Sequence, residues 1–133
     1  MKKVIKTDSE WQKELTEDQY RVLRNSGTEP PFQNRYNDFY EEGTYVCAGC
    51  GEPLYSSSTK YSSGSGWPSF YEPLQKEAVR YEEDHSLWMR RTEVLCAVCD
   101  GHLGHVFPDG PEPTGIRHCI NSTSLKFVPK EKE

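Results

Sequence analysis

Five cysteines carry the most reactive chemistry in this chain, and four of them stand in two pairs. Cys47 and Cys50 form one C-x-x-C knuckle, Cys96 and Cys99 form the other, and a glycine follows each pair closely. A knuckle of this kind points both thiolates at one ion, and a glycine tolerates the unusual backbone dihedral after the second sulfur. The two pairs predict a closed tetrahedral zinc site, with iron the next choice and disulfides the last.

Such a site is expected to be structural. Four thiolates leave no open position for water or substrate, which argues against hydrolysis by the metal. The gap between the knuckles is longer than in a compact zinc ribbon, so the ion is expected to tie together two distant parts of one domain. Catalysis must then lie elsewhere in the chain.

The fifth cysteine, Cys119, is the candidate nucleophile. If residues 115–121 are extended, Arg117, Cys119 and Asn121 share one face and His118 lies on the other, so His118 is not expected to be its base. A lone cysteine is often only a small buried hydrophobe. A cation on the same face lowers the pKa of a thiol, however, and an amide is an unusual core neighbour. The balance favours a reactive thiolate.

Two other segments could complete a site around this thiol. His102 or His105 could bind metal, but the cysteines already satisfy one ion, so a general acid or hydrogen-bond role suits at least one of them better. A purely structural role for the other stays open. Trp67, between Gly66 and Pro68, is either a core aromatic after a turn or a flat apolar wall for a small methyl group.

The elements that position these residues are a short helical start and many short strands. Thr16 is a predicted helix N-cap with Gln19 completing a capping box, and residues 25–27 end the helix. Residues 28–43 are predicted to be an extended arm lying across the domain. Its aromatic side chains are all expected to be buried: Phe32, Tyr36, Phe39 and Tyr40.

Beyond Gly43 the pattern predicts an all-β sandwich or barrel-like fold. Residues 79–81 and 87–95 are expected to form a hairpin with its turn at 83–85, and 124–128 a last strand with Leu125 and Phe127 inward. We expect a single domain over 1–133, with helix and arm in 1–43, the zinc-bearing β-core in 44–128 and a tail in 129–133.

Composition narrows the possible partners. The 133 residues suit one modest core, and a mean hydropathy of -0.86 suggests that a metal cross-link assists apolar packing. With a net charge of -5 and scattered basic residues, a nucleic-acid partner is not expected.

A secretion signal and a membrane span of about 20 apolar residues are both missing, so we expect a cytoplasmic protein. In that reducing compartment cysteine pairs bind metal or do redox chemistry more often than they form structural disulfides.

The motifs in their order resemble the B-type methionine sulfoxide reductases over nearly the whole chain. They are the Leu15-Thr16 helix start, Cys-Ala-Gly-Cys-Gly, Gly-Trp-Pro-Ser-Phe, Cys-Asp-Gly-His-Leu-Gly-His-Val-Phe-Pro-Asp-Gly-Pro and Arg-His-Cys-Ile-Asn-Ser. The resemblance implies a mainly β fold of two antiparallel sheets, β-tent-like or sandwich-like, with short N-terminal helices. It also implies one structural zinc per monomeric chain, held by Cys47, Cys50, Cys96 and Cys99.

The same resemblance implies the activity. The chain would reduce the R-epimer of methionine sulfoxide, free or in peptides, and so repair oxidised methionine under oxidative stress. Cys119 would attack the sulfoxide sulfur and become a sulfenic acid, while His105 is favoured as the proton donor. Trp67 and Phe107 would contact the substrate. The polar side of the pocket would be shaped by His102, His105, Asp109, Arg117 and Asn121.

Ser65 departs from the common pattern of that family. Many members carry a second, resolving cysteine just before the Gly-Trp-Pro element, where this chain has Ser65. Either the chain is a one-cysteine type or the serine was engineered to trap an intermediate. In both cases oxidised Cys119 is expected to wait for an external thiol, thioredoxin or a small reductant.

Two other functions use the same cysteine quartet. A non-enzymatic zinc-bearing β-domain could bind a protein partner, but it would not need to assemble Cys119, Trp67 and the histidines. A redox chaperone or sensor would release zinc when the knuckles are oxidised, so zinc retention during turnover distinguishes it from an enzyme.

Overall fold

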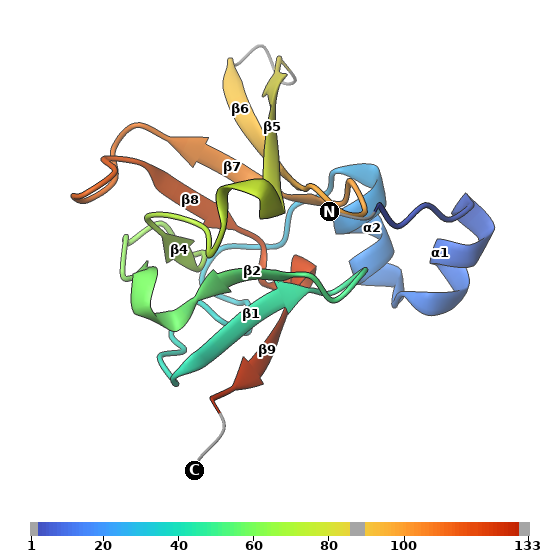
Figure 1. Cartoon of the computed structure of the whole chain (residues 1–133), viewed down its shortest axis with the longest axis horizontal. Helices are drawn as coiled ribbons and strands as arrows, with labels where there is room; N and C mark the ends of the chain where they lie inside the picture. The colour runs from blue at the N-terminus through green and yellow to red at the C-terminus, as the bar shows by residue number, and fades with distance from the viewer. Residues whose placement is uncertain (1–2, 86–89, 131–133) are drawn as a thin grey trace.

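Two antiparallel β-sheets make up most of the computed structural model, which describes residues 3–85 and 90–130 (Figure 1). One sheet has the strand order β2-β1-β9 and the other β3-β4-β8-β7-β6-β5. The strands are β1 (Gly43–Cys47), β2 (Pro53–Ser56), β3 (Lys60–Tyr61), β4 (Ser69–Phe70), β5 (Val79–Asp84), β6 (Arg91–Cys96), β7 (His102–Phe107), β8 (Arg117–Ile120) and β9 (Leu125–Pro129). The expected mainly β, two-sheet fold is confirmed.

Two short helices, α1 (Asp8–Glu14) and α2 (Glu17–Asn25), lie together at one end of the molecule (Figure 1). α2 begins as predicted, with Thr16 as N-cap and a capping box to Gln19, and ends at Ser26 in the left-handed region. α1 has the same capping box between Thr7 and Glu10. Its sequence signal was missed because its seven residues bury one side chain only, Trp11, and so show no apolar periodicity.

The prediction that the aromatic side chains of the arm between α2 and β1 are buried is only partly confirmed. Tyr36 is 3% exposed, and its ring lies 5.3 Å from that of Phe39 and 5.4 Å from that of Tyr45. Phe32 and Tyr40 are 66% and 56% exposed, so the prediction that they are buried is wrong. Phe32 has a positive φ of 64°, and the Tyr40 ring lies 4.0 Å from the ammonium group of Lys60.

The β5–β6 hairpin is confirmed, but its predicted turn at 83–85 is wrong for two residues. Glu83 and Asp84 belong to β5, where they pair with Thr92 and Arg91 of β6. Residues 87–89, which were assigned to the second strand, lie outside the described residues. The last strand, β9, directs Leu125 and Phe127 toward the core as expected.

Stacked aromatic rings join the two sheets. Tyr55 of β2 lies 4.5 Å from Phe70 of β4 in a stacked arrangement, and Tyr45 of β1 meets the same ring at 5.2 Å. All three side chains are fully buried, and aromatic pairs of this kind stabilise a core beyond their buried area.

Neither of the described helices has the length and apolar character that a membrane span needs.

Candidate functional site

Cys119 sits in the middle of the larger sheet and opens into a small pocket. Its strand, β8, pairs with β4 and β7, which places Ser69 and His105 directly opposite Cys119. The pocket has a volume of about 90 Å³. It is lined by Thr28, Trp67, Arg91, Gly104, His105, Phe107, Cys119 and Asn121. Five predicted site residues, from three separate stretches of sequence, therefore meet at one cavity.

The alternation of side chains along β8 follows the prediction. Arg117 and Cys119 are half-buried, whereas His118 and Ile120 are buried on the other side of the strand. His118 Nδ1 lies 2.9 Å from the Tyr55 hydroxyl in the core, and burial lowers the pKa of His118 to about 4. A neutral imidazole facing away from the pocket cannot serve Cys119 as a base.

Burial dominates the ionisation of the Cys119 thiol and raises its pKa above the ordinary value. Arg117 and the Ser65 hydroxyl act in the opposite direction, and the charge of Glu29 adds to the rise. The expectation that Arg117 favours the thiolate therefore holds for its direction, but desolvation outweighs it. Burial therefore favours the thiol form of Cys119, whose proton must move during any nucleophilic step.

Arg117 and Asp109 lie beside the pocket rather than in its lining. Arg117 donates from Nε to Asp109 Oδ1 at 2.9 Å, and its guanidinium stacks 4.3 Å from the ring centre of Phe107. Both residues line a neighbouring groove of about 510 Å³ that also includes Tyr61 and Ser65. This arrangement holds a cation next to Cys119 and fixes the Phe107 ring.

The two candidate histidines differ in position. His105 lines the pocket, and its Nε2 lies 2.7 Å from Asp84 Oδ2. His102 is buried behind it, with Nδ1 2.5 Å from Glu93 Oε2, and burial lowers the pKa of His102. The rings meet edge to face at 5.4 Å. His105 is thus the histidine placed to reach a ligand, and His102 supports it.

Asn121 and Trp67 are both held by the arm. Asn121 Oδ1 accepts from the backbone N–H of Glu29 at 3.2 Å, and its Nδ2 donates to the Leu103 carbonyl at 3.1 Å. The indole Nε1 of Trp67 donates to the Glu29 carbonyl at 3.1 Å. Trp67 is therefore a pocket wall rather than a core aromatic.

Three acidic residues around the site were missed by sequence reasoning, namely Glu29, Asp84 and Glu93. Glu93 pairs with His105 across β6 and β7, and Asp84 reaches the same imidazole from β5. Predicting these contacts requires the register of β5, β6 and β7. The pairing of β6 with β7 contains a bulge between Val94 and Leu95. No local signal marks them.

The four remaining cysteines gather as predicted. Their sulfur atoms all lie within 4.8 Å of one another, with 3.6 Å between Cys47 and Cys99 and 3.5 Å between Cys50 and Cys96. A tetrahedron with Zn–S bonds of about 2.3 Å has edges of about 3.8 Å. The cluster can therefore hold a metal ion. Cys47 ends β1 and Cys96 ends β6, so such an ion joins the two sheets.

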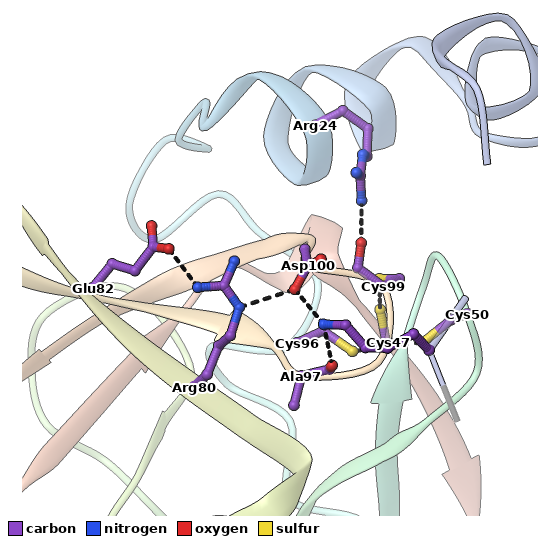
Figure 2. A network of polar contacts seen from close by, with 10 residues as sticks. Arg24, Cys47, Cys50, Arg80, Glu82, Cys96, Ala97, Cys99 and Asp100 are labelled. Carbon is purple, nitrogen blue, oxygen red and sulfur yellow. Dashed lines mark hydrogen bonds and ion pairs between the residues drawn. The ribbon is translucent and has the colours of Figure 1, made fainter. Parts of the chain in front are cut away.

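Basic residues surround the second knuckle (Figure 2). Arg24 of α2 donates to the Cys99 carbonyl at 2.7 Å, and Lys3 donates to the Ala97 carbonyl at 2.8 Å. Arg80 and Lys3 both bind Asp100 Oδ1, at 2.9 and 2.7 Å. These contacts fix the knuckle and place positive charge near four sulfur atoms.

The two knuckles place the positive backbone φ at different positions after their second cysteine. Gly51 has a φ of 84°, as expected, but in the second knuckle Asp100, not Gly101, takes the left-handed conformation, with a φ of 63°. Aspartate tolerates this region better than most residues, and the ion pairs of Asp100 hold it there.

Comparison with known proteins gives one consistent family. A family model described as the SelR domain matches residues 15–129. A peptide methionine sulfoxide reductase MsrB of Hahella chejuensis is 58% identical over 96% of this chain and 91% of its own length. The MsrB proteins of Thiobacillus denitrificans and Leptospira interrogans are 58% and 59% identical, over 95% and 93% of this chain and 96% and 95% of their own lengths. The chain therefore belongs to the SelR-domain family, that of the MsrB peptide methionine sulfoxide reductases.

Proposed function

We propose that this chain is an oxidoreductase that reduces the R-epimer of methionine sulfoxide, free or in peptides, to methionine. The observation that supports it best is the pocket of about 90 Å³ in which Cys119, Trp67 and His105 meet. A thiol, an apolar wall and a proton donor are the groups that sulfoxide reduction needs. Membership of the family supports the same activity.

The reaction begins at the sulfur of Cys119. As the thiol loses its proton, its electron pair attacks the sulfoxide sulfur, and His105 donates a proton to the oxygen as negative charge develops there. The thiol proton replaces the one that His105 has donated, so no net proton is gained or lost. The oxygen is transferred to Cys119 and methionine leaves, so one thiol and one sulfoxide give one sulfenic acid and one thioether. The substrate is reduced by two electrons and Cys119 is oxidised by two.

The polar residues next to the pocket assist that step. Arg117, held by Asp109 and stacked on Phe107, stabilises the thiolate, while Asn121 and His102 fix the polar wall behind His105. Phe107 and Trp67 receive the methyl group. Methyl, oxygen and the longer thioether chain must occupy three different places at once, and an S-epimer would place its oxygen against Trp67.

Regeneration of Cys119 requires an external thiol. One thiol attacks the sulfenic acid and releases water, and a second thiol, from thioredoxin or a small reductant, breaks the mixed disulfide. Ser65 cannot take the first role because a hydroxyl forms no disulfide.

The metal proposed for the four-cysteine cluster is one structural zinc per chain, held by Cys47, Cys50, Cys96 and Cys99. A zinc with four thiolates supplies a cross-link and no open coordination position. We further propose that the chain is one domain over 1–133 and acts as a monomer in the cytoplasm, where a reducing environment keeps all five thiols free of disulfides.

Resolved R and S sulfoxides of a methionine peptide provide the test, with Cys119→Ser as the inactive variant. We expect reduction of the R-epimer only, and a loss on the order of 10³-fold or more in Cys119→Ser, because the nucleophile is removed. Unchanged activity in that variant would contradict the proposal. Zinc measured during turnover should stay bound; its release would favour a redox sensor instead.

A further inference from the structure

One buried carboxylate next to the pocket has no part in the reaction described above. Glu29 follows Thr28, which lines the pocket, and Glu29 itself is 5% exposed. We propose that Glu29 is a positioning residue that fixes the indole of Trp67 relative to the Cys119 sulfur, and so sets the width of the methyl slot. The inference rests on the proposed sulfoxide reduction.

The backbone of Glu29 joins two walls of the pocket. Its carbonyl accepts from Trp67 Nε1 at 3.1 Å, and its N–H donates to Asn121 Oδ1 at 3.2 Å. Trp67 comes just before β4 and Asn121 just after β8, the strand of Cys119. A single residue of the arm therefore determines where the indole lies with respect to that strand.

The side chain of Glu29 anchors this backbone. Its carboxylate accepts hydrogen bonds from the backbone N–H groups of Ser122 and Thr123, the latter at 2.8 Å, and from the Thr123 hydroxyl at 2.7 Å. These N–H groups begin the 3-10 turn Ser122–Ser124, whose N-cap residue Asn121 makes no side-chain cap. Glu29 supplies the missing cap from a distant part of the chain, and three bonds to one buried charge make a strong anchor.

Loss of the anchor should have two effects of opposite sign. A shift of Trp67 by about 1 Å moves the methyl group relative to the sulfur, and a misplacement of that size can lower a rate by about 10²-fold. The negative charge of Glu29, in contrast, disfavours the thiolate and raises the pKa of Cys119. Removing the charge should make Cys119 easier to ionise and yet slow the enzyme.

Glu29→Gln tests this combination because it keeps the shape of the side chain. The amide turns one acceptor into a donor that meets N–H groups, so we expect kcat/KM for the R-sulfoxide to fall about 10- to 100-fold. The pH midpoint of Cys119 alkylation by iodoacetamide should fall at the same time. Glu41→Gln, the same change at an exposed position of the arm, should alter neither value.

A double-mutant cycle with Trp67→Phe shows whether the effect passes through the indole. Phenylalanine has no N–H to donate to the Glu29 carbonyl, so adding Glu29→Gln to Trp67→Phe should cost less than it does in the unmodified protein. Losses that simply multiply would overturn the proposal. So would a Glu29→Gln variant within twofold of the unmodified kcat/KM.

Variants at Thr123 keep the proposal testable if Glu29→Gln does not fold. Thr123→Val removes one of the three donors and should lower kcat/KM several-fold, whereas Thr123→Ser retains the hydroxyl and should restore it. Equal activities for the two variants would overturn the proposal.

The failure of the proposed function is a different outcome from the failure of this inference. If the unmodified protein reduces no R-sulfoxide, the proposed function fails. If it is active and Glu29→Gln does not change its kcat/KM, only the inference about Glu29 fails.

Discussion

At the scale of single residues, Ser65 is a hydroxyl-bearing neighbour of Cys119. Its hydroxyl lowers the pKa of the Cys119 thiol, so the two side chains lie near each other. The other four cysteines gather in a separate cluster, where their sulfur atoms lie within 4.8 Å of one another. A sulfenic acid on Cys119 therefore has a hydroxyl, and not a thiol, as its neighbour.

Substitution Ser65→Cys is expected to change the oxidised product. After one turnover without reductant, the unmodified protein should gain the mass of one oxygen atom at Cys119, because the sulfenic acid has no internal partner. The variant should instead lose two hydrogen atoms as a disulfide forms. Intact-protein mass spectrometry distinguishes these states, and an internal disulfide of Cys119 in the unmodified protein, without zinc loss, would contradict the assignment.

His118 makes stability depend on pH. Burial lowers its pKa in the folded protein from 6.5 to about 4, so between these values the unfolded chain binds a proton that the folded chain does not. The stabilisation is complete above pH 6.5 and is lost as the pH falls toward 4. The full difference is about 3 kcal/mol.

His118→Gln should remove that part of the pH dependence, since an amide does not titrate and still reaches the Tyr55 hydroxyl. Between pH 7 and pH 4.5, the free energy of unfolding in urea should fall by about 2 to 3 kcal/mol less in the variant than in the unmodified protein. Acid release of a metal affects both proteins and cancels in the comparison. Identical slopes would mean that His118 is not the titrating group.

At the scale of elements, the features that depend only on residues close in the sequence were predicted correctly. The capping box at Thr16 located α2, and alternation along 115–121 placed Cys119 and His118 on opposite faces. Contacts that depend on register or on long-range packing were not predictable. Asp84 was assigned to a turn and yet contacts His105, and Phe32 was expected in the core and yet is exposed.

The pairing of β7 with β8 depends on Gly104. A Cβ atom there would lie 2.0 Å from the Cys119 carbonyl oxygen, so the two strands could not keep their spacing. Gly104→Ala should lower the free energy of unfolding by about 1–3 kcal/mol and displace Cys119, which thiol alkylation rates would detect. Gly115→Ala, where φ is 72° and nothing lies within 4 Å, should destabilise the chain without changing those rates.

At the scale of the whole molecule, the cysteine cluster is a link between the two sheets in addition to the aromatic rings of the core. Cys47 is the last residue of β1 in the three-stranded sheet, Cys96 is the last residue of β6 in the six-stranded sheet, and Arg24 of α2 donates to the Cys99 carbonyl (Figure 2). The pocket lies in the larger sheet and is closed by the arm that leads into the smaller one. An ion in the cluster therefore stabilises the arrangement on which the pocket depends, without touching it.

Metal removal should consequently act on the fold first. We expect one zinc per chain by elemental analysis, and a fall in Tm of about 10 °C or more after chelation, because structural zinc contributes directly to folding free energy. Cys47→Ser and Cys96→Ser, one from each sheet, should each lose the metal and reproduce that fall. Cys119→Ser should keep both metal and Tm while losing activity. A Cys119→Ser variant that binds no zinc would show instead that the fifth sulfur belongs to the metal centre.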